Sequence, residues 1–250
     1  MRVDLADNVA LVTGAGTGLG RQIALDLAES GMDVAVNYAR SKDAAEEVAA
    51  AIEQAGRRSI AVKADVSQPG EVAELVANIE AALGSISVLV NNAGVTRFIP
   101  FPDIHEITLD DWHDVFSVNV IGAFNCAQLV GPAMAERGGG SILNVSSVSP
   151  YVATGSSLPY TVSKAGVISL TQCLCRALPK SVRVNAIAPG WMDTVWLDKH
   201  VPDELADSVR SGEFPSVAVE GVAQMAVDLI RNDTVSGQTV VVDAGELWRS

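Results

Sequence analysis

The chain has 250 residues, of which 48% are hydrophobic, and a formal net charge of −13. This composition supplies enough apolar side chains for a buried core, and the acidic balance argues against a nucleic-acid partner, because phosphate backbones select basic patches. We find no apolar run of membrane-span length and no signal segment at the N-terminus, so we expect a cytoplasmic protein with no membrane partner.

Cysteines and histidines do not suggest a metal site. Cys126, Cys173 and Cys175 form no CxxC pair, and the three histidines are scattered along the chain. We therefore expect a reduced protein without a bound metal, in which the cysteines are buried, unreactive thiols.

Short apolar runs alternate with helical patterns along the chain. Strands are predicted at residues 8–13, 33–37, 59–64, 87–90, 141–145, 182–186 and 238–242. Helices are predicted after the first strand and over about 43–55, 71–83, 110–136, 160–178 and 222–230. Apolar strands separated by helices are typical of a parallel sheet covered on both faces. With no linker or repeat, the sequence predicts one doubly wound, Rossmann-type α/β domain over residues 1–250, with a mostly parallel, seven-stranded sheet.

A glycine-rich turn follows the first predicted strand and opens the first predicted helix. It reads Thr13-Gly-Ala-Gly-Thr-Gly-Leu-Gly20. Glycines let the backbone approach a pyrophosphate closely, and the helix N-terminus offers free N–H groups and the positive end of a dipole. In this strand–turn–helix context the motif predicts a dinucleotide site.

The end of the second predicted strand bears on which dinucleotide binds. An acidic residue there would hold the ribose 2′-hydroxyl of NAD, but the chain has Asn37, followed closely by Arg40 and Ser41. A guanidinium and a hydroxyl suit a 2′-phosphate. The sequence thus favours NADP(H) over NAD(H), although Arg40 as an ordinary surface arginine, with use of either cofactor, stays open.

Tyr160 and Lys164 are spaced i and i+4, so on a helix they share one face. An ammonium beside a phenol favours the phenolate, and we expect it to lower the tyrosine pKa and suit it to general acid–base work. Taken alone, the pair is better explained as a core tyrosine with a solvated lysine.

Further motifs fall at the predicted strand ends, where open α/β sheets bind ligands. They are Asp65-Val66, Asn91-Asn-Ala-Gly94, Asn144-Val-Ser-Ser147 and Pro189-Gly190. With the glycine turn and the Tyr160–Lys164 pair, the chain resembles the single-domain branch of the short-chain dehydrogenase/reductase family. Within it, the chain is most similar to 3-oxoacyl-carrier-protein reductase-type keto reductases.

The resemblance implies a set of cofactor contacts and four catalytic residues. The implied cofactor contacts are Gly14, Thr17, Gly18, Leu19, Gly20, Arg40, Ser41, Asp65, Val66, Asn92, Ala93, Gly94, Tyr160, Lys164, Pro189, Gly190 and Thr194. The implied catalytic residues are Asn119, Ser147 (favoured over Ser146), Tyr160 and Lys164. Tyr160 would exchange the proton, Ser147 would bind the carbonyl oxygen, Lys164 would hold the ribose, and Asn119 would hold a water next to Lys164.

The segment that follows Pro189-Gly190 departs from the family pattern and looks short. Trp191 and Trp196 there, with Arg97 and Tyr151 from neighbouring loops, are candidates for a substrate pocket, and lid packing is an equal alternative for the tryptophans. Ala244 stands where the family often has glycine.

These observations predict an NADP(H)-dependent oxidoreductase that interconverts a small-molecule ketone and a secondary alcohol, with Tyr160 as the general acid or base. An NAD-dependent alcohol or polyol dehydrogenase on the same fold is the alternative, and a non-catalytic dinucleotide-binding regulator is a third hypothesis. The resemblance also implies a homotetramer or homodimer, paired through the helices at about 110–136 and 160–178.

Overall fold

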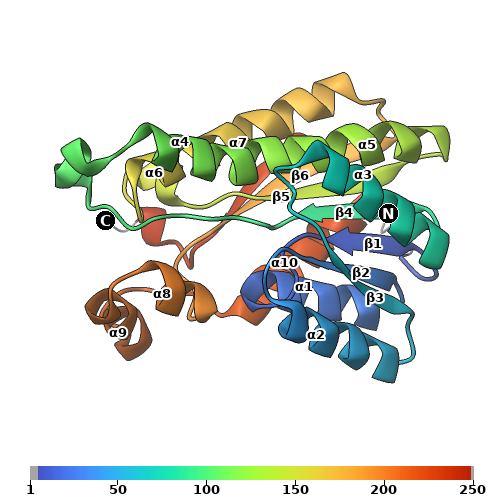
Figure 1. Ribbon diagram of the computed structural model, residues 1–250, viewed down its shortest axis with the longest axis horizontal. Coiled ribbons are helices and arrows are strands. Elements are labelled where there is room, and N and C mark those ends of the chain that lie inside the picture. Colours follow the sequence, from blue (N-terminus) through green and yellow to red (C-terminus); the bar gives the residue numbers. More distant parts are fainter. Residues whose placement is uncertain (1–4, 249–250) are drawn as a thin grey trace.

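Within residues 5–248, which the computed structural model describes, seven parallel strands form one sheet (Figure 1). The strands are β1 Val9–Val12, β2 Asp33–Tyr38, β3 Ser59–Lys63, β4 Ile86–Asn91, β5 Gly140–Val145, β6 Val182–Pro189 and β7 Thr239–Val242. Their order is β3-β2-β1-β4-β5-β6-β7. The predicted fold class is confirmed. The predicted domain also includes residues 1–4 and 249–250, which lie outside the described residues.

The order of the strands reverses beside β1. Leu11 in β1 is paired with Ala35 in β2 on one side and with Leu89 in β4 on the other. The connections after β1 and β4 therefore leave in opposite directions. In such sheets this point opens a crevice at the carboxyl ends of the strands, where ligands bind.

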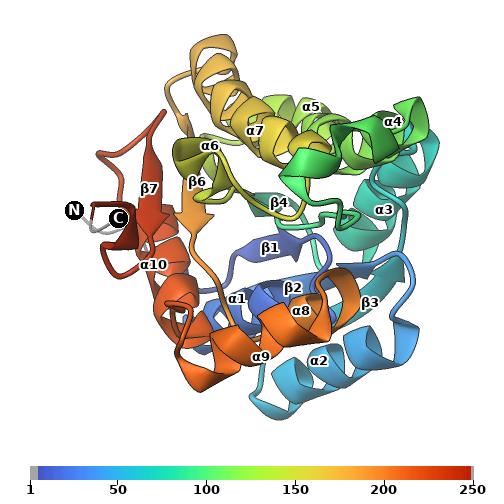
Figure 2. The same cartoon turned by 90° about the vertical axis from the view of Figure 1, so that its left-hand side faces the viewer.

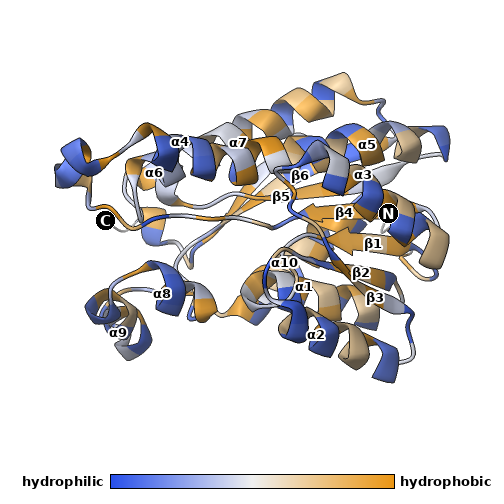
Figure 3. Ribbon diagram, viewed as in Figure 1, coloured by the Kyte–Doolittle hydropathy of each residue, from blue (hydrophilic) through white to orange (hydrophobic). Residues whose placement is uncertain are grey.

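Helices cover both faces of the sheet (Figures 1 and 2). One face carries α1 Gly18–Glu29, α2 Lys42–Gln54 and α10 Val219–Arg231, and the other carries α3 Pro69–Ala82, α5 Ala123–Glu136 and α7 Leu158–Ala177. Each layer encloses its own apolar cluster. Figure 3 shows the matching pattern, with hydrophobic strands inside and mixed helices around them. Burial on both faces explains why the central strands are apolar throughout.

The predicted helix at 110–136 is a continuous helix that contains an unpredicted distortion. It consists of α4 Leu109–Phe116, a π-helical turn Ser117–Gly122 and α5. By length and composition it is apolar enough to cross a membrane, contrary to our expectation of no such run. Half of its most apolar window is buried inside the protein, which is the behaviour of a core helix. π-Turns often occur at functional sites, and Asn119 lies in this one.

The segment after β6 forms two short helices. These are α8 Val195–His200 and α9 Asp203–Ser211. Both views place them at the carboxyl edge of the sheet, on the side of α1 and α2 (Figures 1 and 2). Their apolar residues form a small separate cluster with Phe98 and Trp191 packed against it. The shortened segment is thus an ordered pair of helices. The remaining helical turns are η1 Phe101–Glu106, α6 Ser149–Val152 and η3 Glu246–Trp248.

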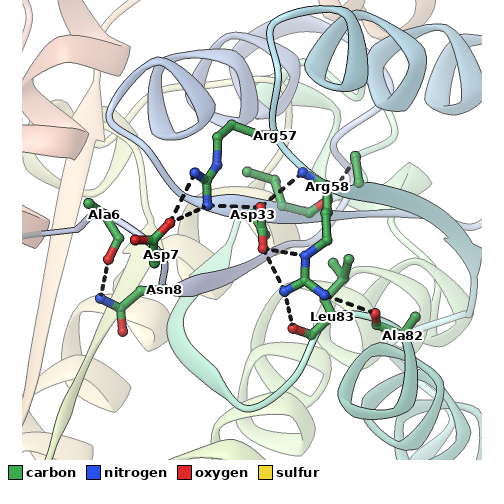
Figure 4. A network of polar contacts seen from close by, with 10 residues as sticks. Ala6, Asp7, Asn8, Asp33, Arg57, Arg58, Ala82 and Leu83 are labelled. Carbon is green, nitrogen blue, oxygen red and sulfur yellow. Dashed lines mark hydrogen bonds and ion pairs between the residues drawn. The ribbon is translucent and has the colours of Figure 1, made fainter.

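A buried carboxylate anchors the opposite, amino edge of the sheet (Figure 4). Asp33 at the start of β2 is 3% exposed and pairs with Arg57 at 3.0 Å and with Arg58 at 2.7 Å. Arg58 also donates to the carbonyl oxygen of Leu83, and Arg57 to the carboxylate of Asp7. Burial raises the pKa of Asp33, but the hydrogen bonds and charges of the two arginines outweigh it, so the pKa is lowered.

The cysteine prediction was partly wrong. Cys126 is buried and its burial raises its pKa to about 12, as expected of an unreactive thiol. Cys173, however, is exposed, and Cys175 is intermediate. Both lie on α7, and side chains two positions apart on a helix face different directions.

Candidate functional site

A cavity of about 430 Å³ opens at the carboxyl edge of the sheet. Its size is within the range of ligand pockets. The predicted site residues that line it are Gly14, Thr17, Gly18, Leu19, Arg40, Ser41, Asp65, Val66, Asn92, Ala93, Gly94, Ser147, Tyr160, Lys164, Pro189, Gly190, Trp191, Thr194 and Trp196. The predicted residues that do not line it are Gly20, Arg97, Asn119 and Tyr151.

The glycine turn is fixed to the end of β4 by side-chain hydrogen bonds. The Asn92 amide donates to the carbonyl oxygens of Thr13 and Gly14, at 2.9 and 3.1 Å. In return, Thr13 Oγ1 accepts from the backbone N–H groups of Asn92 and Ala93, both at 3.0 Å. Asn92 therefore holds the turn in place, a role that the family resemblance does not imply. Thr13 was not among our predicted residues, although its position directly before the glycines was a usable signal.

Gly20 serves packing and does not contact the cavity. A Cβ at this position would lie 2.3 Å from Nδ2 of Asn92 and 2.6 Å from the Gly14 carbonyl oxygen. These distances leave no room for any side chain. The structure thus places Gly20 between the turn and Asn92, outside the cavity lining, and its contact with the pyrophosphate stays a prediction.

The N-terminus of α1 points its backbone into the cavity. Thr17, the N-cap residue, makes no side-chain capping hydrogen bond, and Thr17, Gly18 and Leu19 all line the cavity. The first N–H groups of a helix have no partner within the helix, so here they are left for a ligand. A helix N-terminus without a side-chain cap, opening into a cavity of this size, fits the phosphates of a dinucleotide.

The end of β2 holds a buried amide where a carboxylate would favour NAD. Asn37 is 1% exposed, and its Oδ1 accepts from Gly14 N at 3.3 Å. Its Nδ2 donates to the carbonyl oxygens of Val62 and Ala64. Asn37 thus joins β2, β3 and the glycine turn, while Arg40 and Ser41 lie at the cavity wall beyond it.

Tyr160 and Ser147 meet inside the cavity. Tyr160 is in the first turn of α7, whose N-cap Ser157 accepts a hydrogen bond from Tyr160 N. Removal from bulk water raises the pKa of Tyr160 to about 12, and a hydrogen bond with Ser147 opposes this shift. The expectation that Lys164 brings this pKa toward neutral is wrong for the structure described, because desolvation dominates. Ser146 also lines the cavity, but its hydroxyl donates to the Lys164 carbonyl oxygen at 2.8 Å.

Lys164 is a buried cation one helical turn from Tyr160. It is 4% exposed, its Nζ lies 5.6 Å from the centre of the Tyr160 ring, and it donates to the carbonyl oxygen of Val145 at 2.8 Å. Burial lowers the pKa of Lys164 to about 8. At neutral pH the group is therefore still largely an ammonium.

Asn119 lies behind the cavity wall, with its amide bonded to protein groups. Its Oδ1 accepts from Val95 N at 2.8 Å, and its Nδ2 donates to the Val95 carbonyl oxygen and to Ser163 Oγ. A Cβ at Gly94 would lie 3.4 Å from Oδ1 of Asn119 and 3.6 Å from Nζ of Lys164. Asn119 and Lys164 therefore face the same small space at Gly94.

Two predicted substrate-pocket residues lie elsewhere. Arg97 pairs with Asp111 at 2.9 Å, and Asp111 also completes the capping box of α4 with Thr108. The hydrogen bonds from Thr108 and Arg97 hold the pKa of Asp111 below its usual range, although burial opposes them. Tyr151 on α6 is 44% exposed and outside the cavity lining. Both predictions were wrong, since a loop position alone does not fix the direction of a long side chain.

The tryptophans of the segment after β6 do line the cavity. The Trp196 ring lies 6.0 Å from the Tyr160 ring and 4.3 Å from the His200 ring, centre to centre. Apolar residues absent from our prediction complete this end of the cavity: Val95, Val148, Val152, Met192 and Val195. Lys199 and His200 on α8 were also missed, because the sequence shows no motif there.

Comparisons with known proteins agree with this geometry. The family model described as short chain dehydrogenase matches residues 8–205. The chain is 40% identical to a 3-oxoacyl-[acyl-carrier-protein] reductase, FabG, of Staphylococcus epidermidis, over 94% of this chain and 97% of the relative. It is 38% identical to the granaticin polyketide synthase putative ketoacyl reductase 2 of Streptomyces violaceoruber, over 95% of each.

Solved structures show the same fold. A gluconate 5-dehydrogenase from Burkholderia cenocepacia, in complex with NADP and tartrate, superposes with a TM-score of 0.87 at 32% identity, covering 100% of this chain and 97% of the other. A putative short-chain alcohol dehydrogenase from Sinorhizobium meliloti also gives 0.87, at 35% identity and 98% coverage of both chains.

Proposed function

The chain belongs to the short-chain dehydrogenase/reductase family and is an NAD(P)-dependent oxidoreductase acting on CH–OH and C=O groups; we propose that it uses NADP(H) to reduce a ketone, with Tyr160 as the proton donor. The observation that carries the proposal is the cavity in which Tyr160, Ser147 and Lys164 meet next to the glycine turn. The similarity of the chain to ketoreductases supports the reductive direction of the reaction, from ketone to alcohol.

The proposed preference for NADP(H) rests on the end of β2. Asn37 carries no charge to repel a 2′-phosphate, and Arg40 beside it offers a guanidinium at the cavity wall. The solved relative with NADP bound shows that this fold accepts the phosphorylated cofactor. Gly14, Gly18 and Leu19 would hold the pyrophosphate, with Pro189, Gly190 and Thr194 at the nicotinamide side.

The bound nicotinamide supplies the hydride, and the side chains of the chain manage the proton and the charge. Reduction places negative charge on the carbonyl oxygen, which needs a proton and a hydrogen-bond donor. Tyr160, with its pKa raised to about 12, is protonated at neutral pH and is suited to give that proton. Ser147 would bind the same oxygen, and the Lys164 ammonium would hold the ribose and favour the phenolate that forms.

We assign Asn119 a positioning role. Its amide holds Val95 and Ser163, and Ser163 in turn donates to the Tyr160 carbonyl oxygen at 2.7 Å. This connection fixes the first turn of α7 relative to the end of β4. The Oδ1 atom keeps a second lone pair facing Gly94, where a water next to Lys164 would fit.

The substrate end of the cavity favours a ketone with an apolar body. Val95, Val148, Val152 and the two tryptophans line the cavity that contains Tyr160, and the Trp196 ring lies 6.0 Å from the Tyr160 ring, centre to centre. Such a wall removes the apolar surface of a substrate from water, while Ser149, Thr154 and Ser156, which also line the cavity, offer hydroxyl groups to its polar part.

We also propose a homo-oligomer paired through the long helices. Apolar side chains on them are exposed, including Ile121 at 48%, Phe124 at 39%, Leu129 at 41% and Val162 at 41%. Burying this face against a second copy would remove it from water. A cytoplasmic location stays a prediction.

Tyr160→Phe tests the mechanism, because it removes the hydroxyl and keeps the ring. We expect the rate of NADPH-dependent ketone reduction to fall by roughly 10²- to 10⁴-fold, while NADPH binding, measured by calorimetry, stays within about threefold. Trp112→Phe, at a residue of α4 outside the cavity lining, serves as a matched aromatic control. Turnover by Tyr160→Phe equal to that of the unaltered protein would end the proposed mechanism, and tighter binding of NADH than of NADPH would end the cofactor assignment.

A further inference from the structure

We propose that Lys199, carried on α8, is a second cationic contact for the phosphates of the cofactor, and that this contact holds α8 closed over Tyr160. The inference rests on the proposed function, since it needs a dinucleotide in the cavity. It adds a binding residue from the lid to those at the strand ends.

The backbone of α8 turns Lys199 toward the cavity. Val195, Trp196, Leu197, Lys199 and His200 all line the cavity, so this short helix runs along the cavity wall and Asp198 is its residue outside the lining. Leu197 also belongs to the apolar cluster that α8 forms with α9. This packing against α9 fixes the orientation of the helix.

Two contacts hold α8 in place, one with α9 and one at its N-terminus. Asp198 pairs with Arg210 on α9, so this carboxylate is directed away from Lys199's side of the helix. Thr194, the N-cap of α8, lies 3.5 Å from the position that a Cβ on Gly18 would occupy. The helix thus starts beside the phosphate-binding turn and extends over the cavity.

The charges at the cavity point to an anion. Arg40, which follows β2, and Lys199 line the same cavity, and neither forms an ion pair within 4.0 Å with any described carboxylate. Arg210, by contrast, is matched by Asp193 and Asp198. Two exposed cations without a carboxylate partner, at a cavity that also contains the buried Lys164, are the pattern expected for a phosphate-bearing ligand in a chain with a net charge of −13.

The pKa of His200 reflects the positive charges that line this cavity. Its pKa is lowered by burial first and then by the charges of Lys199 and Arg40, while a hydrogen bond with the backbone of Thr96 opposes these effects. Arg40 and Lys199 thus act on one imidazole, although they are far apart in the sequence. Asp65 is the acidic group that lines the cavity, and its Oδ1 accepts from Ser67 N.

Trp196 connects the charge of Lys199 to the proton donor Tyr160. Trp196 is on the same short helix as Lys199, and its ring packs at a tilt beside the Tyr160 ring, 6.0 Å away centre to centre. A phosphate held by Lys199 would therefore hold the tryptophan that covers the proton donor. We expect the cofactor to bind first and to order the lid before the ketone enters.

The test compares Lys199→Ala with Lys180→Ala, a matched loss of an exposed lysine from the loop between α7 and β6, at the other edge of the sheet. Dissociation constants for NADPH, NADH and adenosine 2′,5′-bisphosphate are measured by calorimetry at low and moderate salt. We expect Lys199→Ala to weaken NADPH binding by roughly three- to tenfold, less at the higher salt, because the lysine is exposed. Lys180→Ala and the charge-retaining Lys199→Arg should bind NADPH as the unaltered protein does.

The ligands distinguish the two phosphate sources. Weaker binding of NADPH and the bisphosphate, with NADH unchanged, assigns Lys199 to the 2′-phosphate, and equal weakening of NADPH and NADH assigns it to the pyrophosphate. Equal affinities of Lys199→Ala and Lys180→Ala for all three ligands would overturn the proposal, while leaving the proposed function standing if the protein still reduces ketones. A protein that binds none of the three would overturn both.

Tryptophan fluorescence reports the lid directly. We expect NADPH to change the emission of the unaltered protein, and the change to be largely lost in Trp196→Phe, which identifies its source. Lys199→Ala saturated with NADPH should show a smaller change. A full change in the saturated Lys199→Ala protein would overturn the coupling between Lys199 and lid closure.

Discussion

The Nζ atom of Lys164 donates a hydrogen bond of 2.8 Å to the backbone carbonyl oxygen of Val145, and the side chain is 4% exposed. A carbonyl dipole offsets only part of the cost of removing an ammonium from water, and the pKa of Lys164 accordingly falls to about 8. A charge buried in this way does not stabilise the fold. Its presence is explained by the ribose and the phenol that it is placed to serve.

Lys164→Met should therefore abolish ketone reduction without weakening the fold. We expect the free energy of unfolding at pH 7 to be unchanged or to rise by up to about 3 kcal/mol. Methionine is similar in length to lysine, so the substitution removes the buried charge and leaves the site filled. Urea denaturation followed by circular dichroism measures this. A loss of more than about 2 kcal/mol at pH 7 would show that the ammonium stabilises the fold.

The same substitution should change the pH dependence of stability. The folded-state pKa of Lys164, about 8, lies below the unfolded value of about 10.4, so between these pH values the unfolded chain binds more protons. This contribution makes stability rise as pH increases from 8 to 10.4. In Lys164→Met it should be missing, so that the unaltered protein gains stability relative to the variant over this range.

Gly94→Ala tests the small space between Asn119 and Lys164. The added Cβ would lie 3.4 and 3.6 Å from their polar atoms, which are ordinary contact distances, so we expect folding to be retained. The methyl group would, however, exclude a water or a ribose hydroxyl from this space. We expect kcat/KM to fall by roughly ten- to 100-fold and the melting temperature to stay within a few degrees. Gly70→Ala, at an open position on α3, is the control, and equal activity of both variants would count against the role assigned to this space.

The strand pattern and the motifs at strand ends were sufficient to predict the sheet, the helices that cover it and many of the cavity residues, but not α8, α9 or the cavity residues that α8 carries. They worked because apolar runs and glycine turns have local physical causes. The directions of long side chains were not predictable, since Arg97 is drawn to Asp111 by a contact that only the folded chain creates. The raised pKa of Tyr160 was also not predictable from the sequence, because desolvation depends on which groups pack around the phenol.

Asp33→Asn should destabilise the protein without affecting catalysis. The carboxylate is buried between Arg57 and Arg58 at the amino edge of the sheet, so removing its charge leaves both guanidinium groups less well paired. We expect a loss of about 2–4 kcal/mol at pH 7. The matched control is Glu80→Gln, in the more exposed pair with Arg137, with an expected loss below about 1 kcal/mol. Equal losses in the two variants would contradict a special role for Asp33.

The effect of Asp33 should depend on pH in a defined direction. Its pKa is lowered in the folded protein, so its contribution is fully present above the unfolded value of about 3.9 and is lost as pH falls through the folded value. The stability difference between the unaltered protein and Asp33→Asn should therefore shrink in strong acid. Chemical denaturation at pH 7, 5 and 3 measures it, and a constant difference would rule out the charge as its source.

Ala244→Gly should stabilise the turn after β7. Ala244 is exposed and has a φ of 57°, in the left-handed region where a Cβ is strained, and the turn is held by Asp243, which accepts from Gly245 N and Leu247 N. We expect the free energy of unfolding to rise by about 0.5–1 kcal/mol, because relief of strain exceeds the added freedom of the unfolded chain. Ala50→Gly, at an exposed position within α2, should lower it by about 1 kcal/mol. A rise in the free energy of unfolding for Ala244→Gly with a fall for Ala50→Gly would identify backbone strain as the cause. A fall for both variants would show that Ala244 is not strained.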